Sequence, residues 1–477
     1  MKLKLVFTIL FGLLLSACAQ NLRILHTNDS HAAYEPASNG QGGYLALEYH
    51  LDEARSERRN SLWLDAGDMQ TGSIISSLEY DGLKGGAVLE VFERLELDAA
   101  TFGNHEFDVS EAHARALTQR AAFPFLSANI LNPDGSSFGR APYQIFRKGN
   151  TKVAVIGLTI DSLPERVKPE NVAKLSILPY TDAIDRVLDE ADAASDLVVI
   201  LSHNGWEADS LLATQLDERV DMIIGGHSHL AFPVAKEING IYILSSGSHL
   251  QYLGQADLRI KQDRIASFDN RLIPLTQAPA DYHSKLAPFL EESIGELERK
   301  LNKVVGILPE AFESDKFRVT TSILWAAQAM VWEYPTADLA MVNNGGFRRN
   351  LPEGEVTLRD LHEYIPFGNT IVFFSCYGRD LMTAQARNLE IMETKPYDIM
   401  TVSEASWLVD SAEDFLIGNN PLQLDKIYRV VSHDYILSQW DKYLGFKPFD
   451  VEEQGDLFLD AIINQIQKQF GPRESGD

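Results

Sequence analysis

The chain has 477 residues, of which 45% are hydrophobic, and its formal net charge is -26 because 68 acidic side chains outnumber 42 basic ones. This length exceeds what one ordinary hydrophobic core accommodates, so we expect two or three domains. A surface this acidic repels polyanions, which excludes the binding of duplex nucleic acid as a main function. An anionic substrate would have to be attracted by local positive charge, such as metal ions or clustered arginines.

The first residues carry the pattern of an export signal. Lys2 and Lys4 form a basic start, and an apolar run follows at residues 5–15. This run is too short to span a bilayer, which takes about 20 residues, so we interpret residues 1–18 as a secretory signal. The signal ends in Leu-Ser-Ala-Cys, which resembles a bacterial lipobox and implies acylation of Cys18. An ordinary signal with a chance cysteine is the alternative.

The use of cysteine fits this interpretation. Cys18 and Cys376 are the two cysteines of the sequence, so a lipid on Cys18 excludes an internal disulfide. Ala19 follows the cysteine and, by resemblance to known sorting rules, favours the outer membrane. We therefore expect an exported bacterial lipoprotein, tethered to the membrane through Cys18 and facing the periplasm or the cell surface.

Short apolar segments that run into polar, often glycine-containing loops recur between residues 22 and 260. We predict strands at residues 22–25, 61–64, 153–158, 197–201 and 222–224, and helices at residues 46–59 and 110–120. Strands that alternate with helices predict an α/β layered domain. In such domains ligands bind beyond the carboxyl ends of the strands, where the loops converge.

The pattern changes near residue 281. Residues 282–301 are rich in Leu, Glu and Lys, with apolar positions near helical spacing. Prolines precede this stretch and Gly306 follows it, so we predict a linker helix within residues 279–306. The linker divides a catalytic domain at residues 19–278 from a second domain of mixed strands and helices at residues 307–477.

Residue types that ligate metals follow five successive strands. The motifs are HTNDSH at residues 26–31, DAGD at 65–68, GNHEFD at 103–108, SHN at 202–204 and GGHSH at 225–229. Each motif alone has a plain structural explanation, because Asp and Asn close turns or cap helices and a lone His is usually just hydrogen-bonded. Their recurrence at five strand ends indicates a metal site. Imidazole and carboxylate ligands without thiolates are typical of Zn, Mn, Fe or Co.

These five motifs, in this order, resemble those of calcineurin-like metallophosphoesterases, in the variants of the 5′-nucleotidase family, which includes bacterial UDP-sugar hydrolases and cyclic-nucleotide phosphodiesterases. The resemblance runs over nearly the whole chain after the signal. It implies an α/β, four-layer metallophosphoesterase sandwich domain, a linker helix and a second α+β substrate-binding domain. It also implies two divalent metal ions, one held by Asp29, His31, Asp68 and His229, the other by Asp68, Asn104, His203 and His227, with Asp68 as the bridging carboxylate.

Two metal ions about 3.5–4 Å apart suit phosphoester hydrolysis, because they acidify a bound water and neutralise the transferring phosphoryl group. The resemblance implies that His105 assists the transition state and that Asp108 orients it. Capping of a helix that begins near Ser110 is the alternative role for Asp108. A zinc-protease interpretation of His105 and Glu106 is excluded, because the HExxH pattern needs a histidine where Val109 stands.

The second predicted domain carries two further matches to the family. Residues 343–348 (NNGGFR) resemble its NGGGIR loop, and residues 366–369 (PFGN) resemble its PFGN turn. The resemblance implies that Asn343 and Arg348 contact the substrate, with Arg318 as a further partner, since forked guanidinium groups suit phosphate. Phe367 would stack on the base. A surface ion pair for Arg348 and a core position for Phe367 are the alternatives.

Residues 439–443 (QWDKY) depart from the Gly-Gly-Asp-Gly-aromatic loop of the family. Asp441 and Tyr443 match the pattern and are predicted substrate residues, but bulkier side chains replace every glycine. Residues 320–322 (TTS) also depart from the Asn- and Gly-containing helix start of most members. Substrate identity is therefore more open than metal chemistry.

We predict an exported two-metal hydrolase of nucleotides, a 5′-nucleotidase with cyclic-phosphodiesterase or UDP-sugar hydrolase activity as variants, which acts as a monomer or small oligomer. One alternative is a hydrolase of the same fold for another substrate, such as a thiosulfate ester, and the altered loop is the reason to consider it. The other is a non-enzymatic surface lipoprotein, against which the intact ligand set argues because buried carboxylates without metal are costly. The sequence leaves open the metal identity, the preferred base and the membrane face.

Overall fold

The computed structural model describes residues 19–37, 39–404 and 414–471. The predicted signal segment and Cys18 lie outside these residues. The chain forms two compact units, which we call the N-terminal unit (up to Thr71, and Ile75–Ser293) and the C-terminal unit (Gly72–Ile74 and Ile294 onward). Apart from the three residues Gly72–Ile74, the chain passes from one unit to the other within helix α8 (Ala287–Leu301).

Two six-stranded sheets form the centre of the N-terminal unit. The first has the order β16 (Ile265–Pro274), β15 (Tyr252–Ile260), β1 (Gln20–Thr27), β2 (Ser61–Asp65), β5 (Ala99–Thr101), β6 (Phe125–Leu126). The second has the order β13 (Lys236–Ile238), β14 (Ile241–Leu244), β12 (Met222–Gly225), β11 (Leu197–His203), β9 (Thr151–Thr159), β8 (Tyr143–Lys148). In the first sheet β1, β2, β5 and β6 pair in parallel, and β15 and β16 add antiparallel pairings at one edge. In the second sheet β14, β12, β11 and β9 pair in parallel, and β13 and β8 add antiparallel pairings at the two edges. The carboxyl ends of the central strands therefore share one edge in each sheet.

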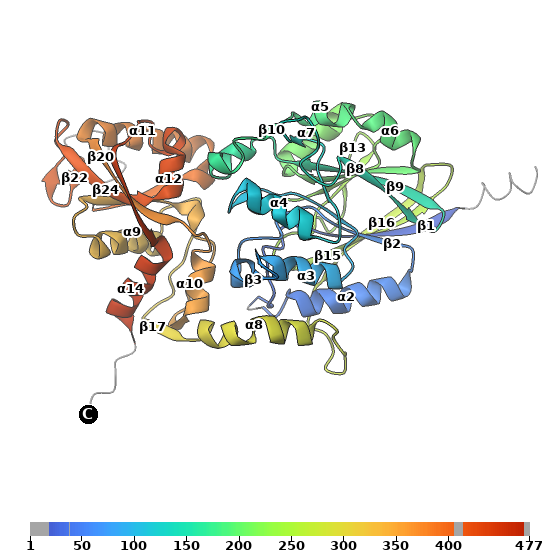
Figure 1. The fold of residues 1–477 in the computed structure, drawn as a ribbon, viewed down its shortest axis with the longest axis horizontal. Helices are drawn as coiled ribbons and strands as arrows, with labels where there is room; N and C mark the ends of the chain where they lie inside the picture. The colour runs from blue at the N-terminus through green and yellow to red at the C-terminus, as the bar shows by residue number, and fades with distance from the viewer. Residues whose placement is uncertain (1–18, 38, 405–413, 472–477) are drawn as a thin grey trace, which may run out of the picture. The chain divides into compact units, whose positions relative to one another are not determined.

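The two sheets face each other across a buried apolar layer. Leu22 and Leu62 of the first sheet belong to the same core cluster as Val153 and Val199 of the second. Helices cover the outer faces, namely α2 (Tyr44–Glu57) and α3 (Gly86–Arg94) on one side and α5 (Tyr180–Asp185), α6 (Leu188–Ala193) and α7 (Trp206–Gln215) on the other (Figure 1). The predicted four-layer α/β sandwich is confirmed.

The sequence patterns located the buried strands better than the exposed ones. The five predicted strands fall within β1, β2, β9, β11 and β12, whose side chains are almost all buried. Strand β5 has three residues, which is too short for a periodic pattern, and β16 alternates exposed and half-buried residues. The remaining elements of this unit are β3 (Glu79–Tyr80), β4 (Leu83–Lys84), α4 (Glu111–Arg120), β7 (Ile130–Leu131) and β10 (Ser176–Ile177).

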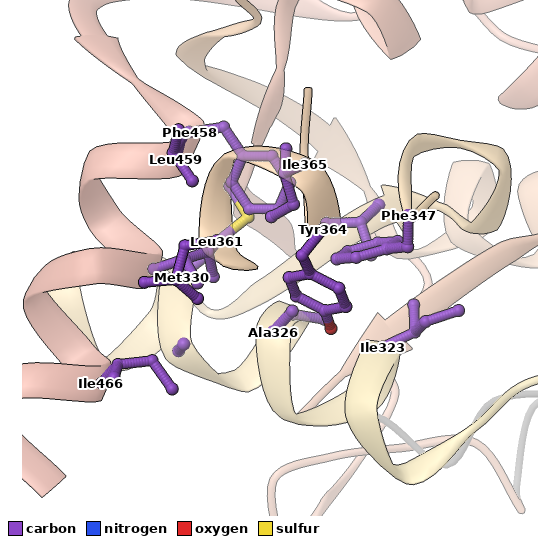
Figure 2. Close-up of a cluster of buried hydrophobic side chains, with 14 of the residues drawn as sticks. Ile323, Ala326, Met330, Phe347, Leu361, Tyr364, Ile365, Phe458, Leu459 and Ile466 are labelled. Carbon is purple, nitrogen blue, oxygen red and sulfur yellow. The ribbon is translucent and has the colours of Figure 1, made fainter. Parts of the chain in front are cut away.

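A five-stranded sheet organises the C-terminal unit. Its order is β21 (Met400–Ser403), β18 (Leu339–Asn343), β24 (Ile427–His433), β20 (Thr370–Tyr377), β25 (Phe449–Leu457). One core cluster joins this sheet to α9 (Thr321–Glu333), α10 (Leu358–Tyr364) and α14 (Phe458–Phe470). Figure 2 shows Met330, Leu361 and Ile466 of these three helices meeting in that core.

The opposite face of the same sheet packs against α11 (Gly378–Thr394), α12 (Asp434–Ser438) and α13 (Trp440–Tyr443). The short strands β17 (Val304–Leu308), β19 (Gly354–Thr357), β22 (Leu416–Ile417) and β23 (Asn420–Pro421) complete the unit. The predicted α+β character of the second domain is confirmed. Among the described residues, the structure contains no helix with the length and apolar character needed to cross a bilayer.

Candidate metal centre

The loops after five strands of the N-terminal unit bring the predicted metal ligands to one place. Three of these strands belong to the first sheet and two to the second, so the site lies where the edges of both sheets meet. The residues are Asp29 and His31 after β1, Asp68 after β2, Asn104 after β5, His203 at the end of β11, and His227 and His229 after β12. Segments far apart in sequence thus form one cluster.

The first ligand group comprises Asp29, His31 and His229, whose donor atoms lie within 4.8 Å of one another. The Nε2 atoms of His31 and His229 are 3.0 Å apart, and Nε2 of His229 is 3.5 Å from Oδ1 of Asp29. Donors around one four-coordinate ion with bonds of about 2.1 Å lie about 3.4 Å apart. The spacing of this group therefore suits a single ion.

The second ligand group comprises Asp68, His203 and His227. Nε2 of His203 lies 3.1 Å from Oδ2 of Asp68. Asp68 also forms a group with His31 and His105, so it lies between the two ligand groups. This is the position that a bridging carboxylate needs.

Backbone carbonyls fix the ring orientation of two ligand histidines. Nδ1 of His31 lies 3.0 Å from the carbonyl oxygen of Thr71, and Nδ1 of His203 lies 2.6 Å from that of Ala66. Because a carbonyl only accepts hydrogen bonds, Nδ1 carries a proton in both rings, and Nε2 is the nitrogen that faces the cluster. This is the arrangement that holds metal-ligating histidines in proteins.

Two buried polar atoms support the fit to metal independently. Nε2 of His203 and Oδ1 of Asn104 are buried and have no hydrogen-bond partner within the described part of the chain. Such atoms cost free energy when they stay unsatisfied, so native proteins rarely contain them. A divalent ion between these donors would satisfy both.

The backbone at the ligands adopts a conformation that side chains disfavour. Positive φ angles occur at Asp29 (50°), His31 (48°), Asp68 (57°), His227 (71°) and His229 (57°). Residues other than glycine adopt this region rarely and at a cost of about 1–3 kcal/mol each. Strain concentrated on one set of ligands indicates that the surrounding structure enforces their placement.

Glu106 holds the loop that carries Asp68, and the sequence analysis did not identify it as a site residue. Its buried carboxylate accepts hydrogen bonds from the backbone nitrogens of Asp68 (3.1 Å), Met69 (2.9 Å) and Gly103 (2.7 Å). A side chain at Gly103 would overlap the carboxylate of Asp68, which explains the glycine there. The sequence signal for Glu106 is an acidic residue between His105 and Asp108, both of which are predicted site residues.

Burial and neighbouring charged groups shift the pKa values of the clustered residues. Burial raises the pKa of Asp29 to about 7 and lowers the pKa of His227 to about 3. Although burial opposes it, the neighbouring His203 and His105 hold the pKa of the Asp68 carboxyl well below its usual range. Neutral imidazoles and ionised carboxylates are the forms that bind metal.

His105 and Asp108 form a hydrogen-bonded pair beside the cluster. Nδ1 of His105 lies 2.7 Å from Oδ2 of Asp108, and Nε2 of His105 lies 3.9 Å from Oδ2 of Asp68. The carboxylate accepts the Nδ1 proton, so Nε2 is turned toward the ligand groups. Helix α4 is capped by Ser110, whose hydroxyl accepts from the backbone of His113 at 3.0 Å. The cap role considered for Asp108 therefore belongs to Ser110.

The C-terminal unit brings some of the predicted substrate residues together. Asn343 ends β18, and the Arg348 guanidinium carbon lies 5.9 Å from the centre of the Phe367 ring. A cation over an aromatic face is a recognised attractive arrangement. The side chain of Arg318 is exposed, and its Nε donates to Asp315 at 2.8 Å.

In the segment 439–443, the two residues that match the family pattern lie in different environments. Asp441 is exposed on α13, whereas Tyr443 is 1% exposed and belongs to the core of the C-terminal unit. The expectation of a substrate-facing Tyr443 is not met in this structure. Two of the three residues that replace the glycines, Trp440 and Lys442, lie within the short helix α13, whose packing places the Tyr443 ring in the core.

Comparison with known families gives two matches in chain order. Residues 22–231 match the model of the calcineurin-like phosphoesterases, and residues 295–448 match that of the 5′-nucleotidase C-terminal domain. A 5′-nucleotidase of Vibrio parahaemolyticus is 27% identical to this chain, over 88% of this chain and 84% of its own length.

Solved structures share the fold of both units. A 5′-nucleotidase precursor from Thermus thermophilus aligns with a TM-score of 0.82 at 21% identity, covering 96% of this chain and 98% of its own. The sulfate thiohydrolase SoxB of Thermus thermophilus aligns with a TM-score of 0.76 at 18% identity, with 94% of both chains covered. The paired domain matches and the relatives that span nearly the whole chain lead to one conclusion: the chain belongs to the 5′-nucleotidase family of metal-dependent phosphoric ester hydrolases.

Proposed function

We propose that this protein is a two-metal 5′-nucleotidase, which releases inorganic phosphate from nucleoside monophosphates. The observation that carries the proposal is the presence of two adjacent ligand groups, of which the second contains Asp68, and Asp68 also forms a group with His31 of the first. Asp29, His31 and His229 would hold one ion, Asn104, His203 and His227 the other, and Asp68 both. When bound, the ions would supply charge neutralisation and an acidified water, and Zn, Mn, Fe or Co suit these donors.

The residues around the ligand groups would position the phosphate for attack. His105, with Nδ1 bound to Asp108, directs Nε2 toward the centre, and in its protonated form it can donate a hydrogen bond from Nε2 to a phosphoryl oxygen. Glu106 keeps the Asp68 loop in place by accepting from the backbone N–H groups of Asp68, Met69 and Gln70. The protein part of the mechanism is thus orientation and charge stabilisation.

Recognition of a nucleotide would use the C-terminal unit. Arg348 offers a forked cation and Phe367 an aromatic face, which together fit an anion attached to a planar base. Asn343 lies at the end of β18 in the same unit, and Arg318 and Asp441 are exposed and available for contact. Cyclic nucleotides and UDP-sugars present the same base and phosphate chemistry, so they are included as candidate substrates.

A thiosulfate ester is the second candidate substrate. The fold likeness to a sulfate thiohydrolase and the helical segment in place of the glycine loop favour it. The match of residues 295–448 to the 5′-nucleotidase C-terminal domain favours nucleotides.

A substrate panel on protein reconstituted with each of Zn, Mn, Fe and Co tests the proposal. We expect hydrolysis of AMP, with cyclic AMP, UDP-glucose and bis-p-nitrophenyl phosphate as comparisons, and loss of activity after chelation. Turnover of cysteine S-sulfate without turnover of any nucleotide would replace the proposal with the thiosulfate-ester alternative.

The proposal includes export as a lipoprotein, supported by the basic start, the apolar run and the lipobox-like end of residues 1–18. Labelled palmitate should be incorporated by the wild type and not by Cys18→Ser, and the variant should leave the outer-membrane fraction. Labelling of both proteins would contradict this part of the proposal.

A further inference from the structure

Thr71 lies three positions after Asp68, at the edge of the candidate metal centre, and was not among the predicted site residues. Its backbone is in the left-handed region, with φ 56°, which is unfavourable for a β-branched residue. This conformation presents two polar groups of one residue to two neighbours. The carbonyl oxygen accepts from Nδ1 of His31 at 3.0 Å, and the hydroxyl donates to Oδ2 of Asp108 at 2.7 Å.

The direction of each hydrogen bond follows from the chemistry of the acceptor. Oδ2 of Asp108 also accepts from Nδ1 of His105 at 2.7 Å, so one carboxylate oxygen receives two donors. A carboxylate has no proton to give, which fixes Thr71 Oγ1 and His105 Nδ1 as donors. A continuous chain of hydrogen bonds therefore runs from His31 through Thr71 and Asp108 to His105.

Asp108 depends on this chain for its orientation. Its side chain is 22% exposed, so water can compete for its oxygens. The Thr71 hydroxyl restricts rotation of the carboxylate, and the carboxylate in turn fixes the ring of His105. The Thr71 carbonyl fixes the ring of His31, whose centroid lies 5.2 Å from that of His105. One residue thus sets the directions of a ligand imidazole and of the imidazole proposed to act on the phosphate.

We propose that Thr71 is a positioning residue, which couples the orientation of His105 to that of the ligand His31 without touching the substrate. This inference rests on the proposed role of His105 and Asp108 in phosphoester hydrolysis. It predicts that the hydroxyl of Thr71 matters for turnover, whereas the backbone carbonyl, which every substitution retains, matters for metal binding.

The substitution Thr71→Val tests the hydroxyl with little change of shape, because both residues are β-branched. We expect kcat for AMP to fall about 10- to 100-fold, the range for loss of an outer partner of a metal site, with KM and metal content close to wild type. Thr71→Ser should restore most of kcat. Because Thr71 acts through His105, the double variant Thr71→Val with His105→Ala should be no slower than His105→Ala alone.

The control is Thr118→Val, which removes a buried threonine hydroxyl that donates to the carbonyl of Ala114 within α4, and it should leave kcat unchanged. Wild-type kcat in Thr71→Val, with a large loss in His105→Ala, would overturn the inference and spare the proposed function. Full activity of His105→Ala would instead overturn the proposed catalytic pair. If Thr71→Val does not fold, the comparison of Thr71→Ser with Thr71→Ala isolates the same hydroxyl, and equal rates for the two would refute the inference.

Discussion

The candidate metal centre and the predicted substrate residues of the C-terminal unit differ in how firmly the fold places them. In the N-terminal unit the six predicted Asp and His ligands fall into groups of donor atoms within 4.8 Å of one another, held by carbonyls, by Glu106 and by enforced left-handed backbone. In the C-terminal unit Arg348 and Phe367 lie together, Arg318 and Asp441 are exposed, and Tyr443 is in the core. Residues directly after a buried parallel strand take their position from the sheet, whereas residues in longer loops do not.

The substitution Asp68→Asn should have the largest effect, and it tests the candidate metal centre. The amide keeps the shape but loses the charge of the carboxylate proposed to bridge the two ions, so we expect kcat/KM for AMP to fall on the order of 10³-fold and bound metal to decrease. Metal analysis and steady-state kinetics measure the two effects. Asp221→Asn is the control, because Asp221 accepts from the backbone of Val198 at 2.9 Å and belongs to neither ligand group. Equal losses in both variants would indicate general destabilisation.

Glu106→Gln tests whether the hydrogen bonds that Glu106 accepts from the backbone around Asp68 enforce the geometry of the ligands. In the wild type, backbone N–H groups donate to both oxygens of the Glu106 carboxylate. Glutamine replaces one of these oxygens with an NH2 group that cannot accept, so at least one of these hydrogen bonds is lost. We expect metal affinity or kcat to fall about 10- to 100-fold, measured by competition with a chelator and by turnover. Unchanged metal affinity would mean that the strand ends alone suffice to place Asp68.

The same contrast explains how much the sequence could predict. Five buried strands and the ligands after them were predictable, because continuous apolar runs and the residues at their ends are local signals. Glu106 and Thr71 were missed, because their roles are hydrogen bonds to groups more than 30 positions away in sequence. Tyr443 was misplaced because the motif match gave the residue type, while packing of α13 decided which way the ring points.

Arg348→Ala tests the pair of predicted substrate residues, Arg348 and Phe367, that lie together in the C-terminal unit. Loss of a charged hydrogen-bonding partner costs about 1.5–3 kcal/mol, so KM for AMP should rise about 10- to 100-fold while metal content stays constant. The neighbouring Arg349 offers a matched control, since its guanidinium pairs with Glu363 at 2.6 Å. Arg349→Ala should leave KM unchanged, and equal effects of the two substitutions would show that net charge alone matters.

Tyr443→Phe carries the smallest expected effect and tests the reassigned residue directly. The ring remains and packs in the same core, but the hydroxyl that bonds with Tyr435 and Asn343 is removed. We expect the free energy of unfolding to fall by about 0.5–1.5 kcal/mol in denaturant titration, the usual contribution of one hydrogen bond. KM for AMP should change less than about twofold, because a ring that is 1% exposed offers no face to a base. A large rise in KM for AMP, but not for bis-p-nitrophenyl phosphate, would mean that the segment opens to let Tyr443 contact the base, as the family pattern implied.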